Sequence, residues 1–367
     1  MLSFTSDYTE GAHPKVLQHF LERNLVTLQG YGSDEDTEEA KRKICAECGR
    51  DDLQIQFLTG GTQTNRVAIS CMLNCYEGVL CAATGHINVH ESGAIESSGH
   101  KVIGLPHTDG KLMAETVAKY MDVYLADDTA EHMVRPGMVY ISHPTEVGTL
   151  YSKAELTALS ETCRKYGLHL FLDGARLGYG LMSPANDVSL RDIVELTDLF
   201  YIGGTKVGAL CGEALVFTRH NMPKHFLAVI KQQGALLAKM RVVSQQFDAL
   251  FTDGLYWEIG RHAIRLAMRL KKMFTDRGYP LFIDSPTNQQ FFILSDEQIE
   301  RLKNDVAFSL WERVDESHMA VRFCTSWSTT DEQLDALEKR CFDSGHSFNI
   351  DRPAVRAAVC EFFLKQL

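Results

Sequence analysis

The most informative stretch of this chain is Asp198–Phe217, which reads DLFYIGGTKVGALCGEALVF. Two apolar runs, Leu199–Ile202 and Ala214–Phe217, flank a glycine-rich turn that carries a single lysine, Lys206. Short apolar runs bounded by glycines are typical of buried strands. Burial lowers the pKa of an amine and makes it a nucleophile toward carbonyl groups. A surface hairpin with a solvated lysine is the alternative, and on this segment alone the two interpretations are about even.

An aspartate earlier in the chain favours the functional interpretation. The apolar run Leu168–Leu172 ends at Asp173, and Arg176 follows three residues later. An aspartate at the carboxyl end of a buried strand lies where open α/β sheets bind ligands. It needs a cationic partner there, which is either Arg176 or a protonated pyridine nitrogen. An aspartate on the pyridinium nitrogen and a lysine bonded to the aldehyde are the protein groups used in pyridoxal 5'-phosphate (PLP) chemistry.

A third segment offers a phosphate site. The strand-like run Gln54–Leu58 leads into a turn that contains Gly60, Gly61 and Thr62, and helical sequence follows over Arg66–Leu73. A glycine-rich turn that opens a helix presents backbone N–H groups and the positive end of the helix dipole to an anion. The segment lacks the Gly-Lys-Ser/Thr of a Walker loop and the Gly-x-Gly-x-x-Gly of dinucleotide sites.

Strand-like and helix-like segments alternate from about residue 50 to residue 250. This alternation predicts a mostly parallel sheet with helices on both faces. The last two strands are joined by only about a dozen residues, so they are candidates for antiparallel neighbours. Asp36-x-x-Glu39 and Ser152-x-x-Glu155 predict helix starts with capping boxes. The strand candidates are Gln54–Leu58, Val79–Ala83, Lys101–Leu105, Met138–Ser142, Leu168–Leu172, Leu199–Ile202 and Ala214–Phe217.

The pattern changes at about Phe251, which predicts a smaller α+β domain. A basic amphipathic helix is expected through Ile264–Asp276, with strands at Phe291–Leu294 and Ala320–Phe323 and a helix that starts at Thr330. We therefore divide the chain into an N-terminal arm (1–24), a large domain (25–250), a small domain (251–342) and a tail (343–367). Within the tail, residues 354–367 are a candidate amphipathic helix.

Composition excludes several classes of function. The 367 residues are 45% hydrophobic and 23% charged, with a formal charge of −11. The acidic balance argues against nucleic acid or an anionic membrane as a partner. We expect no signal peptide, no membrane span and no metal site, because the segments lack the required lengths and ligand spacings. Ten scattered cysteines indicate reduced thiols and a cytoplasmic location.

Taken together in order, these motifs resemble the low-specificity threonine aldolase branch of the β-eliminating lyase family, whose members are fold-type I PLP enzymes. The resemblance covers nearly the whole chain. It implies an aspartate-aminotransferase-like large domain with a mostly parallel seven-stranded sheet. The elements that carry it are Ser6-Asp7, Gly60-Gly61-Thr62-Gln63, His86, Glu91-Ser92-Gly93-Ala94, Pro144–Thr149, Asp173–Leu177, Gly204-Thr205-Lys206 and Arg322.

The resemblance implies cleavage of L-threonine or L-allo-threonine to glycine and acetaldehyde. The alternatives are another fold-type I lyase, acting on phenylserine or by β-elimination, and a non-catalytic PLP-binding protein. The intact set of Lys206, Asp173 and Arg322 argues against the last of these. Arginine is also the residue type that a substrate α-carboxylate calls for, because its planar fork binds both oxygens.

The site residues that follow from the residues and the resemblance fall into three groups. Lys206 and His86 are the catalytic candidates, and His86 is expected to stack on the pyridine ring. Ser6, Arg176 and Arg322 are expected to bind the substrate carboxylate. The cofactor-binding candidates are Gly60, Gly61, Thr62, His86, Asp173, Arg176, Thr205 and Lys206.

Two questions stay open from the sequence. The base for the β-hydroxyl is His86, His143, Glu91 or a held water, because the Ser142-His143-Pro144-Thr145-Glu146 segment departs from the pattern of many threonine aldolases. The basic stretch Lys231–Arg241 is either a solvated face or, as the resemblance implies, a contact with the cofactor phosphate of a neighbouring subunit. The second reading makes the protein a homo-oligomer with composite sites, a dimer or a tetramer.

Overall fold

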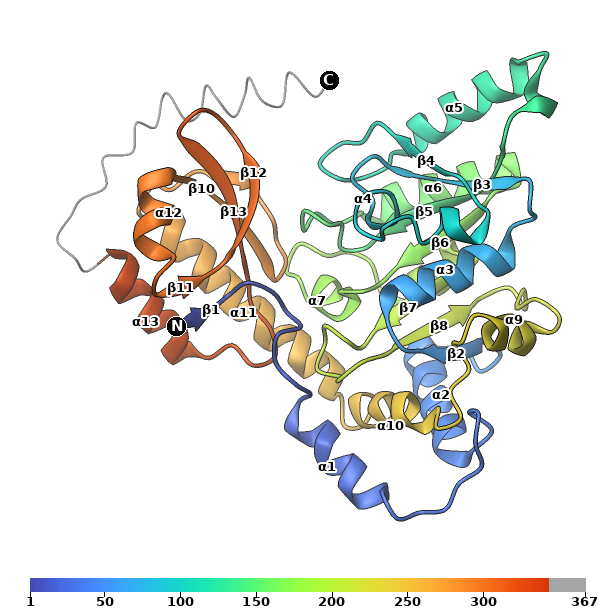
Figure 1. Ribbon diagram of the computed structural model, residues 1–367, viewed down its shortest axis with the longest axis horizontal. Helices are drawn as coiled ribbons and strands as arrows, with labels where there is room; N and C mark the ends of the chain where they lie inside the picture. The colour runs from blue at the N-terminus through green and yellow to red at the C-terminus, as the bar shows by residue number, and fades with distance from the viewer. Residues whose placement is uncertain (343–367) are drawn as a thin grey trace.

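A computed structural model shows the chain as two lobes, a large one around a central sheet and a smaller one beside it (Figure 1). The structure describes residues 1–342. The helix expected in residues 354–367 lies outside the described residues. No helix of the described part is long and apolar enough to span a membrane.

The large domain is built on a seven-stranded sheet, as the sequence predicts. Its strand order is β2-β8-β7-β6-β5-β3-β4. The neighbours from β7 to β4 are parallel, whereas β8 runs antiparallel to both β7 and β2. The predicted antiparallel pairing of the last two strands is therefore confirmed. The strands are β2 Gln54–Leu58, β3 Glu77–Ala82, β4 Val102–Leu105, β5 Arg135–Ser142, β6 His169–Asp173, β7 Leu199–Gly203 and β8 Glu213–Phe217.

Helices cover both faces of this sheet because successive strand residues point to opposite sides. One face packs against α2 Glu35–Cys48, α5 Ala114–Ala126, α6 Lys153–Tyr166, α8 Leu190–Leu196 and α10 Arg241–Leu250. The other face packs against α3 Gly61–Met72, α4 His86–Val89 and α9 Phe226–Gln232. Two more helices, α1 Pro14–Arg23 and α7 Leu177–Leu181, lie in the same lobe. Short 3-10 turns occur at Glu96–Ser98 and Ala130–His132.

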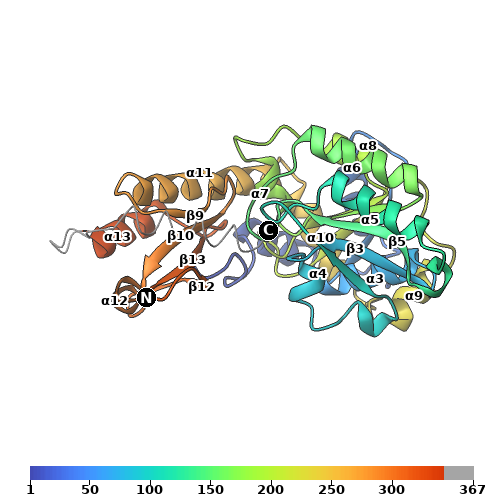
Figure 2. The same cartoon turned by 90° about the horizontal axis from the view of Figure 1, so that it is seen from above.

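The small domain is an antiparallel sheet with helices on one face, which confirms the predicted α+β type. Its strand order is β12-β13-β10-β9. Figure 2 shows the helix Leu255–Thr275 running alongside this sheet, and apolar side chains of the sheet and of its helices form one core. The elements are β9 Leu281–Ile283, β10 Gln289–Ser295, α12 Asp296–Leu302, β12 Ser309–Arg313, β13 His318–Cys324 and α13 Asp331–Phe342.

The long helix α11, Leu255–Thr275, connects the two lobes. Leu255 and Ile259 belong to the core of the large domain, whereas Leu266 and Phe274 belong to the core of the small one. The helix predicted over Ile264–Asp276 is its second half; the apolar spacing extends back to Leu255 and adds the first half.

The N-terminal arm also contacts the small domain. Strand β1, Leu2–Ser3, pairs in parallel with β11, Val306–Ala307, and Phe4 is part of the small-domain core. The division of the chain into domains stays a prediction.

The helix starts agree with the sequence at two of three places. Ser152 and Glu155 form the predicted capping box, and Thr330 exchanges hydrogen bonds with Gln333 in the same way. The box predicted at Asp36 is wrong. Asp34 caps α2 by accepting from the Thr37 N–H, and the Asp36 carboxylate instead contacts Arg23 and Gln245.

Candidate active site

Several of the predicted site residues gather at one edge of the large sheet. Parallel strands end at the same edge, so Asp173 at the end of β6 lies near the segments that follow β3 and β7. Antiparallel β8 begins at this edge with Glu213. The pocket there is lined by Gly61, Asn65, His86, Ser142, Pro144, Glu146, Asp173, Ala175, Arg176, Tyr201, Thr205, Lys206 and Glu213.

Lys206 lies in the glycine-rich turn between β7 and β8, and the turn is fixed from within. The Glu213 carboxylate accepts from the Gly204 N–H at 3.1 Å and from Thr205 Oγ1 at 2.8 Å. Loss of hydration lowers the pKa of Lys206, nearby Arg176 lowers it further, and surrounding carboxylates oppose the shift. A larger fraction of this amine is therefore neutral and nucleophilic than in an exposed lysine.

Asp173 is a buried carboxylate held by four donors. Its Oδ1 accepts from Tyr201 Oη at 2.5 Å and from the Ala175 N–H at 2.9 Å. Its Oδ2 accepts from Tyr140 Oη at 2.5 Å and from Asn65 Nδ2 at 3.1 Å. Burial opposes ionisation most strongly, but the nearby His86 and the hydrogen-bond donors together hold the pKa of Asp173 below its usual value.

The charge of Asp173 fits the pyridinium nitrogen of PLP. Within the described residues no lysine, arginine or histidine nitrogen lies within 4.0 Å of this carboxylate. Arg176, the alternative partner, is paired with Asp7. An ionised carboxylate without an ion-pair partner in a buried site is costly, so the pocket is suited to a ligand that brings a positive charge.

His86 opens the short helix α4 and is oriented by two glutamates. Its Nδ1 lies 2.8 Å from Oε1 of the fully buried Glu91, and its backbone N–H donates to Oε1 of Glu146 at 2.9 Å. Asn65 donates to the same Glu91 oxygen at 2.8 Å and so links Glu91 to Asp173. The hydrogen bonds fix the ring of His86 at the pocket wall, as a stacking partner requires.

The structure separates the candidate bases. His86 lines the pocket, whereas Glu91 lies behind it. His143 is fully buried outside the pocket lining, its Nδ1 accepts from the Tyr151 N–H, and burial lowers its pKa to about 4. Glu146, which is not among the bases considered from the sequence, lines the pocket, and burial raises its pKa. A carboxylate with a raised pKa binds a proton more readily than an ordinary one, as a general base requires.

The predicted phosphate turn opens α3 beside the pocket. Gly60 is the N-cap, and Gly61, the first helical residue, lines the pocket next to Tyr201. The first turn of a helix has N–H groups without intrahelical partners, which suits a phosphate. Thr62 is exposed and is not part of the pocket lining. Thr205 lines the pocket, but its hydroxyl is engaged with Glu213 and the Gly212 N–H.

Of the residues predicted to bind the substrate carboxylate, Arg176 is paired with the N-terminal arm and Ser6 belongs to that arm. Arg176 lines the pocket, and its Nε and Nη2 donate to the Asp7 carboxylate at 2.7 and 3.0 Å. Asn288 of the small domain also donates to Asp7, at 2.9 Å. Ser6 Oγ is buried and has no hydrogen-bond partner among the described residues. A buried hydroxyl without a partner is a group available to a ligand.

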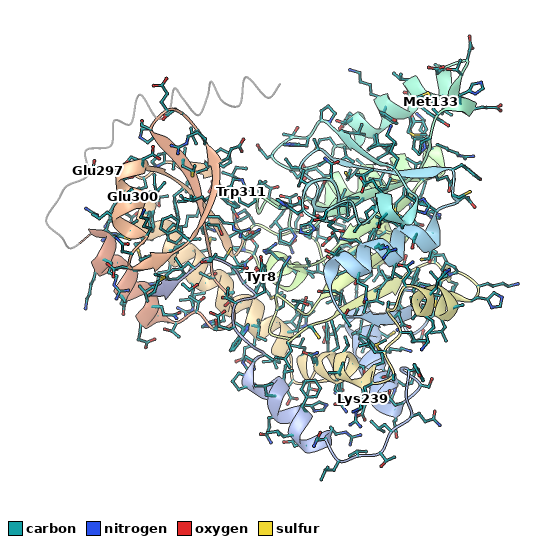
Figure 3. The ribbon with its side chains drawn as sticks, viewed as in Figure 1. Tyr8, Met133, Lys239, Glu297, Glu300 and Trp311 are labelled. Atoms are coloured by element: carbon teal, nitrogen blue, oxygen red, sulfur yellow. The ribbon has the colours of Figure 1, made fainter. Side chains whose placement is uncertain are left out.

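Arg322 lies in β13, on the sheet of the small domain, and is not part of the pocket lining. Its Nη1 donates to Gln289 at 3.1 Å, and its Nη2 lies 3.3 Å from the Thr5 carbonyl and 3.2 Å from Ser309 Oγ. Its guanidinium carbon is 5.2 Å from the centre of the Trp311 ring. In Figure 3, Trp311 lies on the side of the small domain that faces the large one, and Tyr8 lies between the two lobes.

Four polar residues of the site are not predicted from the sequence. Tyr140 and Tyr201 stand in apolar strand runs and read as core, Glu213 stands at the start of another, and Asn65 stands inside a helix. A signal existed only for Glu213, because an acidic residue next to a buried strand and close to a buried lysine needs a partner.

Comparisons with known proteins agree with this geometry. The profile of the β-eliminating lyase family matches residues 4–332. The low-specificity L-threonine aldolase of Pseudomonas aeruginosa is 31% identical over 343 residues, which cover 92% of this chain and 96% of that protein. A threonine aldolase structure from Leishmania major has a TM-score of 0.87 and 40% identity, with 99% and 100% of the two chains covered.

A more distant neighbour shows the fold alone. The histidinol-phosphate aminotransferase of Clostridium acetobutylicum has a TM-score of 0.70 at 14% identity and covers 97% of this chain and all of that one. The chain has the aminotransferase-like architecture of fold-type I PLP enzymes. It belongs to the β-eliminating lyase family, and it is a PLP-dependent lyase.

Proposed function

We propose that this protein cleaves L-threonine and L-allo-threonine to glycine and acetaldehyde. The observation that carries the proposal is one pocket that joins a lysine of lowered pKa, an ionised aspartate without an ion-pair partner and an oriented histidine. The similarity to threonine aldolases of Pseudomonas aeruginosa and Leishmania major supports the choice of substrate.

Each residue has a distinct part in holding the cofactor. Lys206 supplies the amine for the aldehyde, Asp173 the charge for the ring nitrogen and His86 the face for the ring. The start of α3 at Gly60 and Gly61 supplies N–H donors for the phosphate. When bound, PLP withdraws the electron pair that remains at Cα after the bond to Cβ breaks.

The substrate has to be held by its carboxylate, because the bond that breaks must stand perpendicular to the cofactor ring. Arg322, Arg176 and Ser6 are the groups proposed for this task. Arg322 donates to the Thr5 carbonyl, which links the strand that carries Arg322 to the arm that carries Ser6. Preorganisation of this kind can contribute several kcal/mol to the lowering of the barrier. His86 and Glu146 are the groups at the pocket wall that can take the β-hydroxyl proton.

We further infer a cytoplasmic homo-oligomer. The nine described cysteines are free thiols, which suits a reducing compartment. Lys231 and Lys239 are exposed on the large domain, where Figure 3 labels Lys239. Sedimentation of the PLP-loaded protein would test this, and a monomer at all concentrations with full activity would contradict it.

A panel of β-hydroxy amino acids with detection of the released aldehyde tests the proposed reaction. We expect acetaldehyde and glycine in equal amounts from L-threonine and L-allo-threonine. Faster turnover of phenylserine than of either would favour the phenylserine lyase, and pyruvate or ammonia from substrates with a β-leaving group would favour β-elimination. PLP binding without any product would leave only a binding protein.

A further inference from the structure

Asp173 accepts more hydrogen bonds, and shorter ones, than it needs merely to hold the cofactor. In this structure four donors contact the carboxylate, two on each oxygen, and the two shortest bonds, both 2.5 Å, come from the hydroxyls of Tyr140 and Tyr201. Both tyrosines are almost fully buried.

The two tyrosines reach Asp173 because of strand order and register. Strand β6 lies between β5 and β7, and Ser142 of β5 is opposite Asp173. Tyr140, two residues before Ser142, therefore points to the same face of the sheet, as does Tyr201 from β7. Each hydroxyl approaches a different oxygen of the carboxylate.

Both tyrosines act as donors. Burial, the negative charge of Asp173 and the hydrogen bond to it raise the pKa of each phenol well above its usual value, so each hydroxyl keeps its proton. A carboxylate that accepts strong hydrogen bonds is a weaker base than one without them. It therefore draws less strongly on any further proton that approaches it.

We propose that Tyr140 and Tyr201 are positioning residues that weaken Asp173 as a base and thereby limit how firmly the cofactor ring nitrogen keeps its proton. The proposal rests on the proposed function, in which Asp173 faces that nitrogen. The ring acts as an electron sink to the extent that its nitrogen is protonated, so these two hydroxyls adjust the strength of the sink.

The other charged groups around Asp173 act in both directions. His86 and Lys206 favour the ionised carboxylate, whereas Glu146 and Glu213 disfavour it. Asn65 donates to Asp173 and to Glu91, which holds His86. The tyrosines differ from all of these because they bind the carboxylate oxygens directly and at the shortest distances.

Ser142 and Glu146 lie on the other side of Tyr140, between it and the backbone of His86. Ser142 donates to Glu146 at 2.6 Å and lies 3.3 Å from Tyr140 Oη, and Glu146 accepts from the His86 backbone. Tyr140 donates its hydrogen to Asp173 and Ser142 donates its hydrogen to Glu146, so none remains for a bond between the two hydroxyls. Hydrogen bonds therefore link Asp173 to His86 through Asn65 and Glu91.

The test uses PLP labelled with ¹⁵N in the ring and bound to the full-length protein. Tyr140→Phe and Tyr201→Phe each remove one donor and keep the ring. We expect the ¹⁵N resonance of each variant to move toward that of a fully protonated pyridinium and the ring proton to persist to higher pH. Tyr151→Phe is the matched control, because Tyr151 is equally buried and its hydroxyl bonds to the Leu112 backbone instead.

A substitution that should shift the ¹⁵N resonance in the opposite direction keeps the test valid if the phenylalanine variants fold poorly. 3-Fluorotyrosine at position 201 keeps nearly the same shape and is a stronger donor, so the ¹⁵N resonance should move the other way. In the PLP-free protein, infrared titration should show a higher pKa of the Asp173 carboxyl in both phenylalanine variants, with Asp173→Asn to assign the band. If the tyrosines have only a structural role, the ¹⁵N resonance and the pKa of the Asp173 carboxyl should stay at their wild-type values.

The outcomes separate this inference from the proposed function. If wild-type protein takes up no PLP through Lys206, both fail. If PLP binds and Asp173→Asn lowers ring protonation, but the two phenylalanine variants and fluorotyrosine leave the resonance where it is, only the role of the tyrosines is overturned. Shifts in the directions given, absent in Tyr151→Phe, support it.

Discussion

The two domains present different kinds of site residues. In the large domain, Lys206, Asp173 and His86 follow the ends of three strands of one sheet, and Asp173 and His86 are fixed by hydrogen bonds of 2.5–3.1 Å among buried groups. In the small domain, Arg322 stands within a strand and is held by Gln289, Thr5 and Ser309 at 3.1–3.3 Å. The first set is preorganised by the fold, whereas the second depends on how the arm and the small domain are seated.

This difference assigns different kinetic roles to the two domains. Groups fixed by the large sheet should govern cofactor capture and the chemical step, because their geometry changes little when substrate arrives. A group that is held across the arm and the small domain should govern substrate orientation. Substitutions in the two domains should therefore separate cofactor binding from product ratio and KM.

The largest effect is expected at Lys206. Lys206→Ala removes the only amine proposed to bond to the aldehyde, so aldol cleavage should fall by several orders of magnitude. The visible absorption of bound PLP should disappear, while circular dichroism should show an unchanged fold. A borohydride-reducible link to the cofactor that persists in the variant would show that another lysine carries it.

Asp173→Asn should have the second largest effect on activity, with the large domain still folded and PLP still bound. The variant keeps the shape of the side chain and removes the charge proposed to retain the ring proton. We expect kcat to fall by roughly 10²–10³, the range for loss of one preorganised electrostatic contact in an active site. Turnover close to that of the wild type would make Asp173 a structural partner of the tyrosines and nothing more.

The sequence predicted these two residues because each stands at the end of a strand whose apolar pattern is local. Tyr140 and Tyr201 could not be predicted in the same way. A tyrosine in an apolar run reads as core, and its hydroxyl gains a meaning only when the strand order places β5, β6 and β7 side by side. The pairing of Asp7 with Arg176, across most of the large domain in sequence, likewise depends on tertiary structure.

The fold was more accessible to sequence reasoning than the site. All seven strands of the large sheet appear where the apolar runs predict them, because burial on both faces leaves an unmistakable pattern. The first half of α11 is not predicted, because Leu255 and Ile259 lie just after Phe251, where the pattern changes between the two predicted domains. Roles of individual residues such as Ser6 and Thr62 stay predictions.

Arg322→Lys addresses the small domain and should have an intermediate effect. Lysine keeps the charge and loses the planar fork, so the substrate carboxylate can swivel. Loss of one charge-assisted hydrogen bond costs about 1.5–3 kcal/mol, so kcat/KM should fall roughly tenfold to a hundredfold. The share of slow transamination or racemisation among the products should rise. An unchanged product ratio would show that this arginine does not orient the substrate.

Trp311 should give the smallest effect and the sharpest comparison between the domains. The ring lies 5.2 Å from the Arg322 guanidinium carbon and packs against Phe291, so it limits the motion of an arginine that has only moderate hydrogen bonds. A partly exposed cation–π contact is worth about 0.5–1 kcal/mol, so Trp311→Leu should raise KM for threonine by roughly two- to fivefold. Trp311→Phe retains an aromatic face and should recover most of the loss.

The visible spectrum of bound PLP should stay the same in both variants, because the groups that hold the cofactor belong to the other domain. A spectral change in Trp311→Leu, or a fall in kcat without a change in KM, would mean that the small domain also shapes the cofactor environment and that the two domains do not divide the work in this way.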